Sequence, residues 1–473
     1  MGGSAADAAV AMAAALNLAE PCSTGIGGDA FALYFDPKTK KVSCLMGNGA
    51  SSRHVSLALL AERGFGTGPG LQPLPRHHGL CVTVPGAVAL WEDLLARHGS
   101  GNLTMSDVLA PAIEAAERGT VIHPVTAAQW AVSHLQGAEA MRVFKLPNKA
   151  PHGTSESGDE LTHKPSNGSS MDRHTPAAGE LFRNPDLAST FRQLAADGAQ
   201  LGFYRGRIAA AVAAAVAQHG GVLDEEDLAH HRTEIAAPVA ADYKGYRVYE
   251  TPPPTHGVAA LIALKLLEAV DARTGGSTEN GQHIRRGDER QAHVMLECMR
   301  LAYSDALGLV CDPLCCEEKE RAQLEALLSA RYIAARAALV TETSAEVSPG
   351  DPSPYLEGDT VYFCCTDQWG GACSMINSNY TGFGTGKLFT VFCPFSSHST
   401  VGIVPLGCGF TLQNRGHNVS LEPNHPNVAG PRKRPYHTII PGLITRPVSG
   451  QDDEEEFYCV FGNMGGFMQP SEQ

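Results

Sequence analysis

The chain has 473 residues and a formal net charge of −14, because its 50 acidic side chains outnumber 36 basic ones. This excess of negative charge argues against a nucleic-acid-binding protein, whose affinity rests on basic groups that neutralise phosphates. Hydrophobic residues make up 43% of the chain, which excludes global disorder. The length predicts two or three domains, although a single α/β fold can also be this long. The 50 glycines and 30 prolines indicate many tight turns.

The cysteines and the apolar runs predict a free-thiol protein without a membrane span. The 13 cysteines include two adjacent pairs, Cys315-Cys316 and Cys364-Cys365, which have poor geometry for a structural zinc site. We therefore expect reduced thiols and no metal. No apolar run reaches the ~18–20 residues of a membrane helix, and no secretory signal is visible, so a cytoplasmic location is favoured. The sequence enters an Ala-rich helix almost at once, which predicts a missing N-terminus.

The first part of the chain alternates predicted helices and strands. Residues 5–18 are almost all helix formers and predict a helix that is buried on most sides. After a Gly-rich turn, residues 30–35 and 42–45 predict the two strands of a hairpin. Residues 88–120 predict two helices separated by a turn. Residues 145–175 are polar and rich in Ser, Gly, Pro and His, so we expect a solvated insertion there.

Periodic order returns after this insertion. Residues 186–197 and 207–219 predict amphipathic helices. Residues 246–250 predict a strand that ends at a run of prolines, which remove the donors that a strand ladder needs. Residues 257–270 and 289–305 predict two further helices. Together these elements indicate a layered α/β protein.

An acidic linker then runs directly into a strand whose first residue carries a hydroxyl. Residues 339–359 are rich in Ser, Pro and acidic side chains, and residues 360–365 are β-branched, aromatic or Cys. In an intact chain, Thr360 only starts a strand. If the Asp359–Thr360 bond breaks, Thr360 gains an α-amine with a reference pKa of about 7.7–8.0 beside its hydroxyl. One residue would then supply both the nucleophile and the general base.

Other enzyme motifs are weak or missing. The turn Gly25-Ile26-Gly27-Gly28 lacks the spacing of a dinucleotide-binding loop and does not open a helix. The sequence contains no Walker motif, no G-x-S-x-G elbow and no H-E-x-x-H metal motif. The residues alone therefore leave the junction at Thr360 as the main candidate for chemistry.

Nine motifs resemble, in order and over nearly the whole chain, those of the γ-glutamyltranspeptidase family of N-terminal-nucleophile hydrolases. They are Gly2 to Ala11 (GGSAADAAVA), Glu20 to Gly28 (EPCSTGIGG), Val84-Pro85-Gly86, Phe203 to Gly206 (FYRG), Gly220 to Leu228 (GGVLDEEDL), Thr251 to Gly257 (TPPPTHG), Gly358-Asp359-Thr360, Asn377-Ser378 with Phe383 to Gly386 (FGTG), and Met464-Gly465-Gly466. Each motif alone is a weak signal, but their shared order is specific.

The resemblance implies an α/β (α+β) fold, the four-layered αββα sandwich of N-terminal-nucleophile hydrolases, with two central antiparallel sheets and helices outside. It also implies a precursor that cleaves itself between Asp359 and Thr360. Residues 1–359 would form the large-subunit segment and residues 360–473 the small-subunit segment. The two fragments would remain together as a heterodimer.

The resemblance also assigns catalytic roles to four residues. Thr360 matches the nucleophile, and Ser378 matches the second hydroxyl, which orients the nucleophile's amine. Gly465 and Gly466 match the pair whose backbone N–H groups form the oxyanion hole. Glycine suits that task because no Cβ keeps the backbone away from the developing charge.

The residues that recognise a glutamyl group in the family are largely replaced. Arg53 lies one residue after the position of the arginine that holds the α-carboxylate, and Asn418 stands where an acidic residue holds the α-amine. A substrate-binding Asn of the family falls on Tyr380, and a Ser-Ser pair falls on His437-Thr438. His437 and Arg415 could instead present positive charge to a simpler carboxylate.

The resemblance therefore implies an enzyme that cleaves γ-glutamyl amides, such as glutathione, through an acyl-Thr intermediate. Water or an amino acid would accept the acyl group, and no cofactor is needed. The replaced residues favour an alternative, an amidohydrolase or acylase of the same family that acts on a small non-glutamyl amide such as oxamate. A second alternative is a catalytically dead member.

Two features depart from the family pattern. Residues 387–402 stand where the family runs directly from FGTG into IVP, which predicts an aberrant insertion beside the active-site loop. The sequence also ends soon after Gly465-Gly466, which predicts a truncated small-subunit segment and an incomplete gene model.

Overall fold

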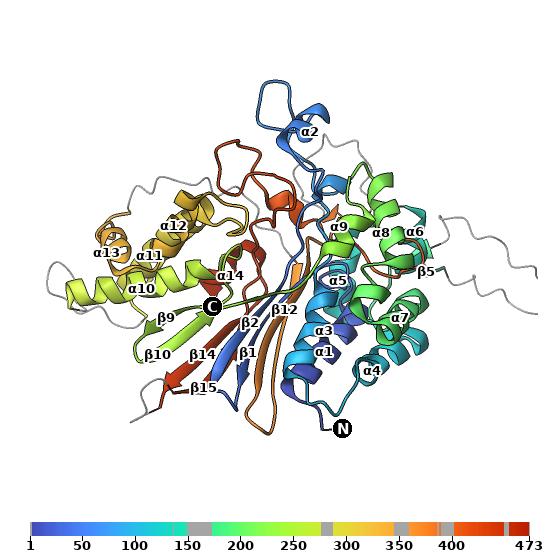
Figure 1. Cartoon of the computed structure of the whole chain (residues 1–473), viewed down its shortest axis with the longest axis horizontal. Coiled ribbons are helices and arrows are strands. Elements are labelled where there is room, and N and C mark those ends of the chain that lie inside the picture. Colours follow the sequence, from blue (N-terminus) through green and yellow to red (C-terminus); the bar gives the residue numbers. More distant parts are fainter. Residues whose placement is uncertain are drawn as a thin grey trace, which may run out of the picture.

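The computed structural model describes residues 2–135, 137–148, 173–275, 287–344, 359–385, 387–388, 402–448 and 454–472. Most of the predicted insertion at 145–175, the linker at 339–359 and the insertion at 387–402 therefore lies outside the described residues. The described chain is built on two antiparallel sheets with helices on both outer sides (Figure 1).

The first sheet has the strand order β11-β12-β1-β2-β8. Its strands are β1 (Asp29–Asp36), β2 (Lys41–Gly47), β8 (Glu234–Ala236), β11 (Asp359–Thr366) and β12 (Ala372–Tyr380). The side chains of β1 alternate between its faces, as the period of a strand requires. Ala30 and Ala32 pack into the core beneath the helices. Phe31 and Leu33 point the other way, into the core between the two sheets.

The second sheet has the strand order β15-β14-β10-β9. Its strands are β9 (Val239–Tyr243), β10 (Tyr246–Glu250), β14 (Gly442–Pro447) and β15 (Glu455–Phe461). Phe31, Ile376 and Leu443 belong to one buried cluster that draws on both sheets. The two sheets therefore pack face to face.

Helices cover the outer face of each sheet (Figure 1). The largest core joins the first sheet to α1 (Ala5–Ala19), α3 (Ala87–His98), α4 (Met105–Arg118), α7 (Pro185–Gly202) and α8 (Gly206–Gln218). On the other side, α10 (Gly257–Thr274) packs on the second sheet, where Leu261 forms one buried cluster with Ala241 and Val248. A further core joins α10 to α11 (Glu289–Leu309) and α13 (Ala330–Ala337). The expected αββα sandwich is confirmed.

The remaining elements are short and connect these layers. They are α2 (Leu57–Glu62), η1 (Gly79–Cys81), β3 (Thr120–Val121), α5 (Pro124–Val132), β4 (Ser133–His134), α6 (Ala138–Phe144), β5 (Leu146–Pro147), β6 (Arg173–His174), β7 (Leu181–Phe182), α9 (Glu225–His230), α12 (Glu318–Ala326), β13 (Lys387–Leu388), η2 (Arg415–Asn418), η3 (Gly466–Met468) and α14 (Gln469–Glu472).

The predicted elements agree with the observed ones, with two differences. The helix predicted to end at residue 197 continues as α7 to Gly202, across a kink at Gly198, whose φ is 70°. The length predicts separate domains, whereas the first sheet takes strands from both sides of residue 360. None of the described helices combines the length and the apolar composition that crossing a bilayer requires.

Candidate active site

Thr360 and Ser378 lie side by side on neighbouring strands of the first sheet. Thr360 is the second residue of β11 and Ser378 is near the end of β12, and their hydroxyl oxygens are 3.2 Å apart. Both side chains are buried, with 3% and 1% exposure. The register between β11 and β12 shifts between Asp359 and Val361, and such bulges re-aim side chains. The structure thus brings the two predicted hydroxyl residues within hydrogen-bond distance.

The start of β1 lies against this pair. Asp29 is directly opposite Ser378 in the antiparallel register of β1 and β12. Gly28 precedes Asp29, and a Cβ atom on Gly28 would lie 2.2 Å from the carbonyl oxygen of Ser378. Only glycine allows this close approach. The Gly-rich turn therefore allows the start of β1 to pack closely against β12, the strand that carries Ser378.

Arg415 is a buried cation beside the end of β12. Its guanidinium carbon lies 4.1 Å from the ring centroid of Tyr380, and its Nη1 donates to Thr438 Oγ1 at 2.8 Å. The side chain is only 1% exposed, yet Nε and Nη2 have no hydrogen-bond partner among the described residues. Burial lowers the pKa of Arg415 to about 10, so the group stays charged at neutral pH. A buried guanidinium with two unused donors is well suited to an anionic ligand.

Asp29 is fully buried and accepts three hydrogen bonds. The donors are the Gly49 N–H at 3.1 Å, Gln413 Nε2 at 2.9 Å and His437 Nε2 at 3.0 Å. Burial raises the pKa of Asp29 to about 7, although the charge of Arg415 and the bonds from Gly49 and Gln413 act in the opposite direction. Asp29 therefore titrates near neutral pH.

His437 is neutral in this network. Its Nδ1 accepts from the Ile439 N–H at 3.4 Å, so the ring proton is on Nε2, which donates to Asp29. Burial, and then the charge of Arg415, lowers the pKa of His437 well below its usual range. Of the two residues that were expected to present positive charge, only Arg415 is charged in this arrangement.

Asp29 predicts a specific pH dependence of stability. The folded protein keeps the Asp29 proton up to pH about 7, but the unfolded chain keeps it only up to about 4, so unfolding releases a proton in this range. Stability should therefore fall as pH rises from about 4 to about 7, by up to about 4 kcal/mol. Asp29→Asn removes this titrating group. The melting temperature of the variant should therefore decrease less between pH about 4 and about 7 than that of the unsubstituted protein. Identical slopes for both proteins in differential scanning fluorimetry would show that Asp29 stays ionised throughout.

Gly465 and Gly466 form the turn that opens η3. The φ angle of Gly466 is 55°, in the left-handed region that favours glycine. Within the described part of the chain, neither glycine donates a backbone hydrogen bond through its N–H. The next residue, Phe467, lines a cavity of about 480 Å³ together with Tyr380 and Thr438. The glycine pair thus directly precedes a residue of the cavity wall.

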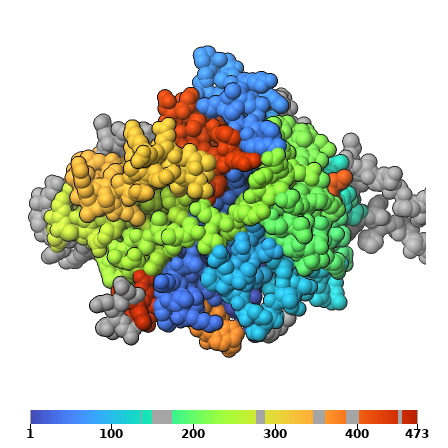
Figure 2. Space-filling model, in the orientation of Figure 1, coloured from blue at the N-terminus to red at the C-terminus, as the bar shows by residue number. Residues whose placement is uncertain are grey.

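Asn418 lines the same cavity and is held in place by its own loop. Its Nδ2 donates to the Tyr436 carbonyl at 3.1 Å. Figure 2 shows this region in orange-red, between the blue segment that precedes α3 and the gold helices α11 to α13. Asn418, Tyr380 and Thr438 thus line one cavity.

Arg53 is engaged elsewhere. Its Nη2 lies 2.8 Å from Asp224 Oδ2 and its Nη1 lies 2.8 Å from Glu226 Oε2, at the start of α9. Ser52 is buried beside it and donates to the Val222 carbonyl at 2.9 Å. The polar partners of Arg53 in the described part of the chain are thus Asp224, Glu226 and Asp227, and neither Thr360 nor Ser378 is among them.

Sequence reasoning missed Asp29 and Gln413. Both are fully buried, and Gln413 Nε2 joins Asp29 to Thr83 Oγ1, at 2.7 Å from the latter. Neither residue stands in a pattern that predicts chemistry. The available signal is that Asp29 directly follows the Gly25–Gly28 motif and that Gln413 lies two residues before Arg415.

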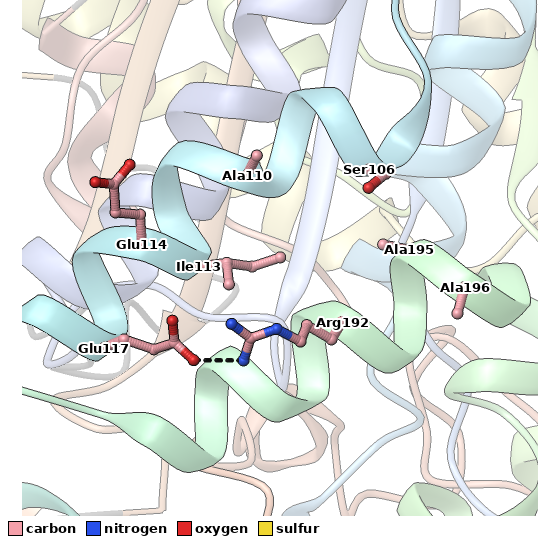
Figure 3. A pocket seen from close by; sticks show the side chains of 8 residues that line it. All are labelled: Ser106, Ala110, Ile113, Glu114, Glu117, Arg192, Ala195 and Ala196. Atoms are coloured by element: carbon pink, nitrogen blue, oxygen red, sulfur yellow. Dashed lines mark ion pairs between the residues drawn. The ribbon is translucent and has the colours of Figure 1, made fainter.

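A second cavity of similar size lies between α4 and α7, away from the hydroxyl pair (Figure 3). It has a volume of about 520 Å³ and is lined largely by Ala110, Ile113, Ala195 and Ala196. Its charged pair, Glu117 and Arg192, is exposed and 2.5 Å apart. The residues that line this cavity include no nucleophile paired with a general base, so the cavity is not a candidate catalytic site.

Comparisons with known proteins match the chain over its whole length. A family model described as gamma-glutamyltranspeptidase matches residues 1–473. The "Glutathione hydrolase-like YwrD proenzyme" of Bacillus subtilis is 31% identical over 472 residues, which are 100% of this chain and 76% of that protein. The "Oxamate amidohydrolase proenzyme" of Klebsiella pneumoniae is 29% identical over 478 residues, 100% of this chain and 76% of that protein. The crystal structure of cephalosporin acylase from Bacillus halodurans has a TM-score of 0.77 and 34% identity, and the match covers 99% of this chain and 74% of that one.

Proposed function

Because the chain belongs to the gamma-glutamyltranspeptidase family, we propose that it is an N-terminal-nucleophile amide hydrolase whose nucleophile is Thr360. The observation that carries this proposal is the 3.2 Å contact between the buried hydroxyls of Thr360 and Ser378. The proposal includes a division of the chain into segments 1–359 and 360–473. The names of the relatives, which are proenzymes, support a processed enzyme.

Maturation would begin at Thr360. Its hydroxyl oxygen attacks the carbonyl carbon of Asp359, the C–N bond breaks, and the acyl group passes from nitrogen to oxygen. Water then hydrolyses the ester, which leaves a carboxylate on Asp359 and a free α-amine on Thr360. The fragments would stay joined, because β12 from the second segment pairs along its length with β1 from the first.

Turnover would use the group that maturation creates. The α-amine of Thr360 takes the hydroxyl proton while the oxygen attacks the substrate amide, and Ser378 orients the amine through its hydroxyl. The N–H groups of Gly465 and Gly466 stabilise the negative charge on the former carbonyl oxygen. The protonated α-amine of Thr360 passes this proton to the substrate nitrogen, the substrate C–N bond breaks, and an amine or ammonia leaves. Water or an amino acid then releases the acyl group from Thr360.

The first candidate substrate class is a γ-glutamyl amide such as glutathione, which the name of the Bacillus subtilis relative supports. Its α-carboxylate needs a cation, because an unpaired buried carboxylate costs several kcal/mol. Arg415 is a buried cation with two unused donors, and the residues that it contacts, Tyr380 and Thr438, line the cavity. We assign the carboxylate-binding role to Arg415.

A small amide with one carboxylate, such as oxamate, is the second candidate. Two observations favour it. Arg53 is held by Asp224 and Glu226, and the neutral Asn418, bonded to Tyr436, stands where an acidic residue would hold an α-amine. The name of the Klebsiella pneumoniae relative supports this class. A direct comparison of γ-glutamyl-p-nitroanilide with oxamate, measured as kcat/KM, separates the two classes.

Arg53→Ala tests where the carboxylate binds. The Arg53 side chain is 27% exposed, and its two ion-pair partners are also accessible to solvent. Loss of the Arg53 side chain should therefore lower the free energy of unfolding by about 1 kcal/mol or less. We expect kcat/KM for the better of the two substrates to stay within about threefold of the unsubstituted protein. Loss of γ-glutamyl turnover in this variant, with an unchanged melting temperature, would instead assign the carboxylate to Arg53.

A catalytically inactive member of the family is the alternative from another functional class. Self-cleavage separates the two readings at low cost, since an inactive scaffold does not need a free amine on Thr360.

A further inference from the structure

Three potential metal ligands meet outside the active site, where the chain passes from α11 to α12. The Sγ atoms of Cys311 and Cys316 and a carboxylate oxygen of Glu320 all lie within 4.8 Å of one another. Cys311 is buried, and the other two residues are partly exposed. We infer that these three side chains form a binding site for a thiophilic divalent cation of the zinc class.

The geometry of the cluster suits such an ion. Zinc binds thiolates at about 2.3 Å and carboxylate oxygens at about 2.0–2.2 Å, so ligand atoms around a tetrahedral ion lie about 3.6–3.8 Å apart. The cluster, with its atoms within 4.8 Å, needs to contract by only about 1 Å. Three protein ligands leave the fourth position for water.

Local structure already orients Glu320. It is the third residue of α12, and its Oε2 accepts from the Glu317 N–H at 2.9 Å in a capping box. This bond fixes the carboxylate while the other oxygen stays available, which is how hydrogen bonds usually orient metal ligands. Cys316 Sγ makes a weak thiol contact of 3.6 Å with the Pro313 carbonyl, which an incoming metal ion can replace.

The neighbouring charges do not compete for the site. Asp312 is bound by Arg434, whose Nη2 lies 2.6 Å from Asp312 Oδ1. Lys433 turns its Nζ away to the Pro426 carbonyl, at 2.6 Å. Both charged neighbours are therefore engaged outside the cluster.

The sequence draws attention to the adjacent pair Cys315-Cys316, but only Cys316 of this pair belongs to the cluster. Cys315 is exposed, and its Sγ faces the Arg432 carbonyl at 3.8 Å rather than the cluster. The second thiol comes from Cys311, five residues before Cys316. This cluster opposes the expectation of no metal, which rested on the adjacent cysteine pairs and on the absence of metal motifs.

Cobalt binding by the reduced full-length chain tests the inference. After removal of bound metal with a chelator, Co²⁺ should bind at about one equivalent with a thiolate-to-cobalt charge-transfer absorption, and Zn²⁺ should displace it. Cys316→Ser should abolish the absorption and weaken binding more than about 100-fold, and Glu320→Gln should weaken it about 10-fold or more. Cys311→Ser should weaken Co²⁺ binding as much as Cys316→Ser. Because Cys311 is buried, this variant could fail to fold, and in that case the Cys316→Ser and Glu320→Gln variants decide the test.

Two matched controls share the same turn and helix. Cys315→Ser removes the neighbouring thiol and Glu318→Gln removes an exposed carboxylate of α12, and both should bind Co²⁺ as the unsubstituted chain does. The inference is overturned if the reduced chain binds no Co²⁺, if Cys315→Ser weakens binding as much as Cys316→Ser, or if freshly isolated protein holds Cys311 and Cys316 as a disulfide. None of these outcomes depends on amide hydrolysis, so they are independent of the proposed function.

Discussion

Thr360→Ala should yield a single uncut chain and should lower amide hydrolysis by about 10⁴-fold or more, since it removes the nucleophile for both reactions. The side chain is buried and small, and its described hydrogen bond is to Ser378, so the fold should survive. Denaturing gels follow the cleavage, and release of p-nitroaniline or ammonia follows the turnover. If the variant is inactive but still cleaved normally, the nucleophile of the maturation step must be a residue other than Thr360.

Thr360→Ser and Ser378→Ala are the matched controls for this substitution. The serine keeps a hydroxyl and an α-amine after cleavage, so it should retain both reactions at reduced rates. Ser378→Ala keeps the nucleophile but removes the hydroxyl at 3.2 Å, so it should slow both reactions without abolishing them. Unchanged turnover in Ser378→Ala would contradict its proposed role in orienting the amine.

Arg415→Met should raise KM for either substrate class by about 100-fold or more, with a smaller change in kcat. Methionine replaces the buried length of the side chain but not its charge, and loss of one partner of a buried charge pair costs about 2–5 kcal/mol. The effect should fall on KM because the carboxylate is held equally in the ground and transition states. Michaelis profiles with γ-glutamyl-p-nitroanilide and oxamate measure this.

Arg415→Lys and Arg53→Met complete the comparison. Lysine retains the charge but not the planar fork of donors, so Arg415→Lys should recover part of the affinity. Arg53→Met removes an arginine of similar length that already has two ion-pair partners, and it should leave KM nearly unchanged. If Arg53→Met raises KM and Arg415→Met does not, the assignment of the carboxylate to Arg415 is wrong.

Much of the fold could be predicted from the sequence because local patterns and global packing agree. The helix formers at 5–18 became α1, and the predicted strand at 30–35 became part of β1. Thr360 and Ser378 were found through motifs, and the structure placed them together because β11 and β12 are adjacent antiparallel strands.

The electrostatic partners could not be predicted, because they come from residues distant in the sequence. Arg53 is close in sequence to the expected anchor, but Asp224 and Glu226 at the start of α9 hold it elsewhere. Asp29 and His437 are 408 residues apart in the sequence and come into contact only in the folded chain. Spacing along the chain contains no information about such contacts.

The mass of the purified, unsubstituted chain under denaturing conditions tests the central claim most directly. If Thr360 is an N-terminal nucleophile, intact mass spectrometry should find two fragments, and Edman degradation of the smaller one should begin Thr-Val-Tyr-Phe, the sequence of residues 360–363. A single uncut chain that hydrolyses γ-glutamyl-p-nitroanilide or oxamate, or a fragment that begins at another residue, would contradict the account.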